Sequence, residues 1–67
     1  MRNEGKFLVY CIEVYKAAKN MNGKQVINLF TKHGVSDYLV TYYDALHTTG
    51  ENYIIEEIDL FMEPLPG

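Results

Sequence analysis

The one thiol and the two imidazoles of this sequence are the side chains that could form a nucleophile with its base, or soft metal ligands. Cys11 lies in the middle of an apolar helical stripe, where cysteine usually acts as a small buried hydrophobic residue. His33 lies in the last turn of a predicted helix, where the helix dipole or packing on Val26 and Phe30 explains an imidazole. We therefore predict no catalytic residue, no metal site and no cofactor.

His47 has the richer surroundings, because Tyr43 lies one helical turn before it and Asp44 three residues before it. General base catalysis would also need a second converging group and a pocket. The simpler interpretation is that a ring nitrogen bonds to backbone groups of the loop at residues 48–52. An enzyme that acts on a small molecule through Cys11 and His47 is therefore an alternative and not the main prediction.

The elements that position these residues are predicted to be four short helices in a single all-α domain. Apolar residues recur in each segment with the period of a helix, which places Tyr42 on the inner face of the third helix and Ile58 and Phe61 on that of the fourth. The longest apolar run, residues 7–18, begins with aromatic and β-branched residues that would also suit a strand, but the good helix formers that follow favour a helix. We expect helices at residues 5–20, 23–33, 37–48 and 53–62, and flexible ends at residues 1–5 and 63–67.

Capping residues predict where three of these helices begin. Asn3 is expected to cap the first helix. Asn22 and Gln25 have the spacing of a capping box at the start of the second helix, in which each side chain bonds the backbone N–H of the other residue. Ser36 is expected to cap the third helix.

Glycines and prolines predict how the helices end. Gly34 suits the left-handed residue that follows the last turn of a helix. Gly50 is the expected positive-φ residue of the loop before the last helix. Pro64 and Pro66 are expected to stop that helix.

The charges are unevenly distributed along the chain, whose net charge is −3. All six basic residues precede position 33, whereas seven of the nine acids follow it. The two halves are expected to attract each other across the fold, or the acids form a docking face. Two short helices around Gly34 suggest a helix-turn-helix, but no Lys or Arg follows Lys32 to contact DNA phosphates, so we do not expect nucleic-acid binding.

The sequence also predicts a compartment. A single cysteine cannot form an internal disulfide, and the first residues lack the basic-then-apolar pattern of a secretory leader. The longest uncharged apolar stretch, residues 7–12, is far shorter than the ~20 residues that cross a bilayer. We therefore expect a cytoplasmic protein that does not enter a membrane.

Short sequence elements spread over residues 7–61 resemble those of a known protein family. Among them are Cys11-Ile-Glu13, Gly34-Val35 and Leu46-His47-Thr48. Together they are similar to a family of short bacterial proteins that is catalogued only as a domain of unknown function. The resemblance implies a compact all-helical protein, which in some members is encoded beside a larger protein resembling ADP-ribosyltransferases. It implies a small partner or antitoxin-like role and assigns no chemistry to any residue.

These observations favour a non-catalytic module for protein–protein interaction, whose partner is another protein or a second copy of the chain. A small homo-oligomeric structural protein is the nearest alternative. The argument from the residues is that several apolar side chains fall outside the helical stripes, where a partner could cover them. The candidate partner-binding residues are Tyr53, Glu56, Glu57 and Leu60, on the outer face of the last helix, and the secondary candidates are Val40, Tyr43 and His47.

Overall fold

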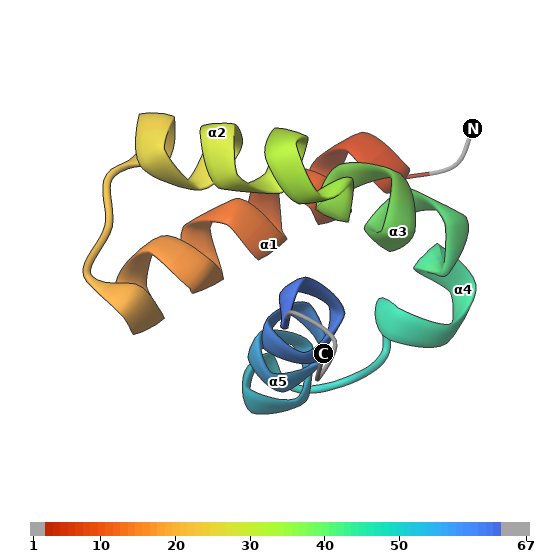
Figure 1. The fold of residues 1–67 in the computed structure, drawn as a ribbon. Coiled ribbons are helices and arrows are strands. Elements are labelled where there is room, and N and C mark those ends of the chain that lie inside the picture. The colour runs from red at the N-terminus through yellow and green to blue at the C-terminus, as the bar shows by residue number, and fades with distance from the viewer. Residues whose placement is uncertain (1–2, 64–67) are drawn as a thin grey trace.

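The computed structural model describes residues 3–63, which form five α-helices around one core (Figure 1). No strand occurs among these residues, so the predicted all-α fold is confirmed, and the predicted number of four helices is close. Four of the five helices have seven or more residues. The helices are α1 (Glu4–Lys19), α2 (Gly23–His33), α3 (Val35–Thr41), α4 (Tyr43–Leu46) and α5 (Glu51–Met62).

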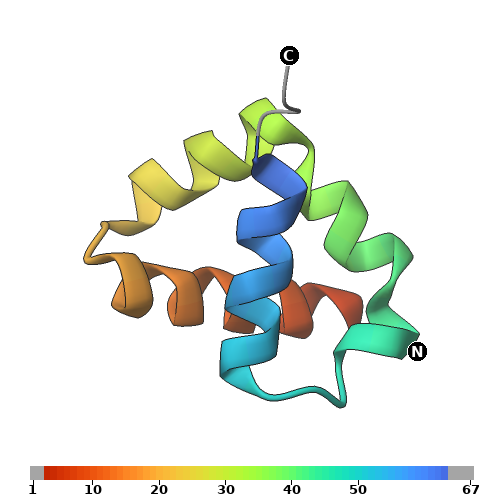
Figure 2. The ribbon, with the colours of Figure 1, turned by 60° about the horizontal axis from the view of Figure 1, so that its bottom comes forward.

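The last helix lies across the others. The first four helices outline a frame, and α5 crosses in front of it in Figure 2. It packs against α1 and α3, while α3 also packs against α1 and α2. The second half of the chain is therefore held onto the first half by both α3 and α5.

Local capping forms the connection between α1 and α2. The Gln25 backbone N–H donates to Asn22 Oδ1 at 2.8 Å, and the Asn22 backbone N–H donates to Gln25 Oε1 at 2.9 Å, so the predicted capping box is confirmed. α2 ends as predicted at Gly34, which has a φ of 68° and donates its N–H to the Phe30 carbonyl. Asn20, which was not predicted to be special, ends α1 with a φ of 54°. Asparagine tolerates this left-handed conformation better than most residues do.

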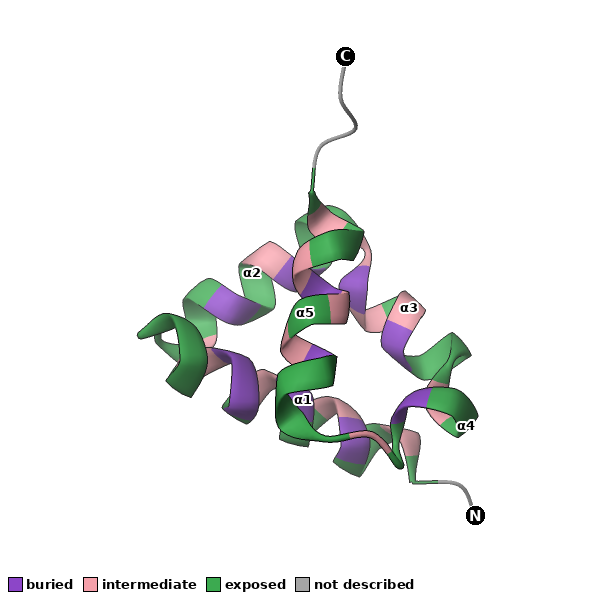
Figure 3. Ribbon diagram, turned by 90° about the horizontal axis from the view of Figure 1, so that it is seen from below, coloured by how far each residue is buried: buried purple, intermediate pink, exposed green. Residues whose placement is uncertain are grey.

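The core takes residues from every helix, as the buried segments in Figure 3 show. Cys11 is fully buried in it, as predicted. The rings of Tyr15 and Phe30 join α1 to α2, with their centroids 5.5 Å apart. The buried apolar residues are Phe7, Cys11, Val14, Tyr15, Val26, Phe30, Val35, Leu39, Leu46, Ile54 and Ile58.

The helix predicted at residues 37–48 is interrupted at Tyr42, which has a φ of −103° and a ψ of 25°. A β-branched residue and two aromatic residues meet at this point, and these types weaken a helix. The break turns α4 toward α1, where the ring of Tyr43 meets that of Phe7 edge-on with the centroids 5.4 Å apart. Tyr42, which the helical period placed on the inner face, is consequently 53% exposed.

One predicted cap, Ser36, and one predicted turn residue, Gly50, are wrong, and the predicted cap Asn3 is confirmed in position only. α3 begins at Val35, directly after the left-handed Gly34, so Ser36 lies inside the helix and does not cap it. Asn3 occupies the N-cap position of α1, but its side chain makes no capping bond because its backbone is not extended. Gly50 has a φ of −79° and leads into α5 in an extended conformation. The predicted stops at Pro64 and Pro66 lie outside the described residues, as do residues 1–2 and 64–67 of the two predicted flexible ends. Glu4 and Gly5, which were assigned to the first flexible end, begin α1.

We expect Gly34→Ala to lower the free energy of unfolding by roughly 1–2 kcal/mol, because a side chain disfavours the left-handed conformation by about that amount. A Cβ at Gly34 would meet no atom within 4 Å, so this cost comes from the backbone alone. Gly50→Ala is the matched control: it too would meet nothing within 4 Å, and its φ is ordinary. Urea unfolding followed by circular dichroism should place Gly50→Ala within about 0.5 kcal/mol of wild type. Equal losses in the two variants would contradict the argument.

Candidate functional site

The outer face of α5 carries the four predicted partner-binding residues, and three of them face solvent. Tyr53 is 50% exposed, Leu60 is 62% exposed, and Glu56 is exposed between them. Glu57 is half-buried, because it turns toward α3 and accepts a hydrogen bond from Tyr38 Oη at 3.1 Å. Three of the four predicted residues are therefore exposed on one helix, and the hydrogen bond of the fourth connects this face to α3.

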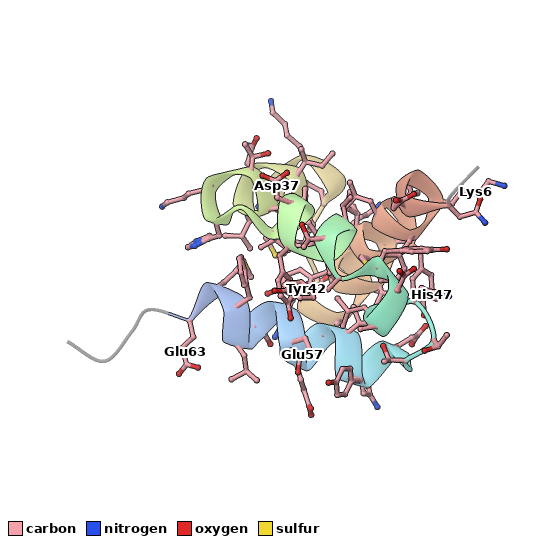
Figure 4. The ribbon with its side chains drawn as sticks, turned by 90° about the vertical axis from the view of Figure 1, so that its right-hand side faces the viewer. Lys6, Asp37, Tyr42, His47, Glu57 and Glu63 are labelled. Atoms are coloured by element: carbon pink, nitrogen blue, oxygen red, sulfur yellow. The ribbon has the colours of Figure 1, made fainter. Side chains whose placement is uncertain are left out.

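Aromatic side chains that the sequence did not assign to a site extend this face. The rings of Tyr38 and Phe61 stack with their centroids 4.4 Å apart and an interplanar angle of 19°. Tyr42 lies next to Tyr38 at 5.2 Å, and Figure 4 shows it between α3 and α5. Phe61 is 42% exposed, although the helical period placed it on the inner face of α5. We call Tyr38, Tyr42, Tyr53, Leu60 and Phe61 together the α3–α5 surface.

The electrostatics of the α3–α5 surface are acidic. Asp37 and Glu57 lie on either side of Tyr42 in Figure 4. None of the six basic residues of the chain follows position 32. Burial raises the pKa of Tyr38, and so do its hydrogen bond to Glu57, the charge of that carboxylate and the neighbouring Tyr53 and Tyr42. Tyr38 therefore stays a neutral hydroxyl that donates to Glu57.

A second group of polar side chains fastens α5 to α1. Tyr15 Oη donates to Asp59 Oδ1 at 2.6 Å, and Lys19 Nζ donates to Asp59 Oδ2 at 2.7 Å. Burial by itself would raise the pKa of Asp59, but the hydrogen bonds from Lys19 and Tyr15 and the charge of Lys19 lower it further than burial raises it. This ion pair is a contact between the basic and acidic halves, of the kind that the charge distribution predicts. Its role is structural.

His47 bonds to a backbone group, as predicted, but the group does not belong to the loop at residues 48–52. Its Nδ1 is 2.8 Å from the Tyr43 carbonyl oxygen, one turn before it and not in the loop that follows. Because a carbonyl only accepts, Nδ1 is the donor, and in the neutral ring Nε2 is the acceptor. The His47 ring also stacks on Tyr43, with centroids 4.4 Å apart and an interplanar angle of 11°. Val40, the third secondary candidate, is exposed on α3.

The thiol and the two imidazoles differ in their exposure to solvent. Cys11 has no exposed surface, and burial raises the pKa of its thiol from 9.0 to about 12, so the nucleophilic thiolate is absent at neutral pH. His33 and His47 are both exposed. Across residues 3–63 no group of three or more His, Cys, Asp or Glu side chains is placed to hold a metal ion.

Comparison with known proteins gives one match. A family model described as a protein of unknown function, DUF3791, matches residues 6–64, which is most of the chain, so the chain belongs to this family. No curated protein and no solved structure matches it. None of the helices in the described part of the chain combines the length and the apolar character needed to cross a membrane.

Proposed function

We propose that this member of the DUF3791 family is a non-catalytic protein–protein interaction module that binds its partner through the α3–α5 surface. The observation that carries the proposal is the exposure of Tyr53, Leu60 and Phe61 on α5 and of Tyr42 at the end of the neighbouring α3. Aromatic residues are enriched at protein interfaces, where a few of them supply most of the binding free energy. Isolated exposed apolar residues are common, whereas a group of this kind is typical of a binding surface.

The charge around the surface indicates the chemistry of the partner. Seven acids and no basic residue follow position 33. A symmetric dimer through this surface would bring like charges together, since the same patch of both copies meets in such an interface. The favoured partner is therefore another protein, with basic side chains around an apolar groove or pocket. A homo-oligomeric structural protein is the alternative, in which the acidic surface of one copy meets the basic half of the next.

The sequence resemblance supports a more specific form of the proposal. It implies an antitoxin-like or regulatory partner of a neighbouring enzyme that resembles ADP-ribosyltransferases, in the cytoplasm of a bacterium. A small domain that only has to bind and restrain an enzyme needs an exposed binding surface and no active site of its own. The α3–α5 surface suits that requirement.

Leu60→Lys tests the proposal, because Leu60 is the most exposed large apolar residue of the α3–α5 surface. The change removes an apolar anchor and adds a positive charge that a basic partner would repel. Affinity for the partner captured by the tagged wild-type protein should fall at least ~5-fold, which corresponds to ~1 kcal/mol. Titration calorimetry would measure it after circular dichroism has confirmed that the variant is folded.

Ile27→Lys is the matched control, since Ile27 is also about half exposed but lies on α2, in the basic half of the chain. It should leave affinity unchanged. Unchanged binding by Leu60→Lys at both low and high salt would exclude the α3–α5 surface. If the wild-type protein self-associates in sedimentation experiments and Leu60→Lys is monomeric, the homo-oligomeric alternative holds instead.

A further inference from the structure

A shallow hollow of about 380 Å³, largely open to solvent, lies at the end of the molecule where the start of α1 meets α4. Small-molecule sites in proteins occupy roughly 300–1,000 Å³, so this hollow is at the lower end of that range. It shares no lining residue with the α3–α5 surface. The residues that line it are Asn3, Lys6, Phe7, Tyr10, Tyr43, His47 and Thr49.

Four rings in a row form the apolar part of the hollow. Tyr10 stacks on Phe7 with centroids 6.4 Å apart, and Tyr43 meets Phe7 edge-on at 5.4 Å. His47 continues the row by stacking on Tyr43. Phe7 is buried, whereas Tyr10 and His47, at the two ends of the row, are exposed. Offset-stacked and edge-on contacts with such rings favour a flat aromatic molecule.

The polar lining is positive or neutral. Lys6 supplies an ammonium group, and Figure 4 shows it at the same end of the molecule as His47. Asn3 contributes an amide that makes no capping bond to α1. No carboxylate is among the lining residues, although the chain as a whole has a net charge of −3. The N-terminal end of α1 also favours a negative charge, because the helix dipole makes this end partly positive. Glu4 lies in the first turn of α1 but does not line the hollow.

From this combination we infer that the hollow binds a small planar aromatic carboxylate. The aromatic ring lies against Tyr10, Phe7 and His47, and the carboxylate pairs with the Lys6 ammonium and accepts from the Asn3 amide. Such a group occurs both in free aromatic acids and at the end of a peptide whose last residue is aromatic. The volume suits one or two fused rings with a short acid chain.

Indole-3-acetate is the probe, in a titration of the ¹⁵N-labelled protein followed by NMR. A ligand of this size should bind with a Kd on the order of 1 mM. The backbone signals that shift should be those of the lining residues on α1 and around His47. Indole-3-acetamide, which has the same ring and no charge, should bind at least about 3-fold more weakly, because it cannot form the charged contact to Lys6.

Lys6→Gln should lower the affinity for indole-3-acetate to that for the amide. Lys24→Gln is the matched control, because Lys24 is an exposed lysine on α2 that does not line the hollow. N-acetyl-tryptophan distinguishes the two sources. If it binds more tightly than indole-3-acetate, the site is assigned to a peptide end. If it binds more weakly, the site is assigned to a free aromatic acid. Shifts away from the lining residues, equal binding of acid and amide, or equal losses in both lysine variants would overturn the inference.

Discussion

Leu39→Ala should remove most of the stability of the protein. Leu39 has no exposed surface and lies in α3, the helix that packs against α1, α2 and α5. Truncation of a fully buried leucine to alanine costs about 2–5 kcal/mol, because the lost apolar contacts add to the cavity left behind. A core in a domain below ~70–80 residues rarely supplies more than about 3–5 kcal/mol. The variant should therefore be largely unfolded in water or unfold at very low urea concentrations.

Leu60→Ala is the matched control, because it deletes the same atoms from a side chain that is 62% exposed. Its free energy of unfolding should stay within about 0.5 kcal/mol of wild type. Urea titrations of the three proteins, followed by circular dichroism at 222 nm, make the comparison. Similar losses in the two variants would mean that the core is not organised around α3 as described.

The features that the sequence predicts best are those with local causes. Asn22 and Gln25 lie three residues apart and bond to each other's backbone, so the start of α2 follows from four consecutive residues. Gly34 ends the same helix for an equally local reason. The burial of Cys11 and Ile58 follows from the helical period of apolar residues. None of these predictions required knowledge of what each helix packs against.

The largest feature that the sequence missed, the break at Tyr42, brings together residues that are distant in the chain, and the smaller ones are choices between nearby residues. The apolar period through residues 37–48 is that of a continuous helix, but the chain breaks at Tyr42, and α4 packs its Tyr43 ring on Phe7. Ser36 was expected to cap α3, but the left-handed Gly34 turns the chain by itself, and α3 begins at Val35, before Ser36. Asn20 and Gly50 can both adopt a positive φ, and only Asn20 does.

Only part of the α3–α5 surface could be predicted from the sequence. Tyr53 and Leu60 fall outside the apolar stripe of α5, so their exposure could be predicted from its period. Tyr42 and Phe61 fall on the inner side by that period, but Tyr42 lies at the break after α3 and Phe61 in the last turn of α5, and both are partly exposed. The joining of residues from α3 and α5 into one surface depends on tertiary packing, which a single sequence does not describe.

Raising the pH from 9 to 11 should cost the wild-type protein roughly 2 kcal/mol through Cys11 alone, at ~1.4 kcal/mol per pH unit for one proton above the unfolded pKa. Burial raises the pKa of this thiol from 9.0 to about 12, because the fully buried site disfavours the thiolate. The unfolded chain thus loses the proton first. The stability is fully present below pH 9 and is lost as the pH rises through 9 toward 12.

Tyr15 adds to the loss from about pH 10, the ordinary pKa of tyrosine. Burial raises its pKa, and so do its hydrogen bond to Asp59 and the charge of that carboxylate, so the folded protein keeps the hydroxyl proton after the unfolded chain releases it. Measurements between pH 8 and pH 10 therefore report mainly on the thiol. The steeper loss above pH 10 reports on the thiol, on Tyr15 and on Tyr38, whose pKa is raised as well.

Cys11→Ala separates the thiol from every other group. At pH 7 the variant should be less stable than wild type by about 1 kcal/mol, because a small buried side chain has been truncated. Between pH 8 and pH 10 its free energy of unfolding should change less than that of wild type, so the two urea-unfolding curves approach each other as the pH rises. The buried thiol of wild type should also react with a thiol reagent far more slowly in buffer than in urea. Parallel pH profiles for the two proteins would show that Cys11 ionises as easily in the folded chain as in the unfolded one, and its place in the centre of the core would then be wrong.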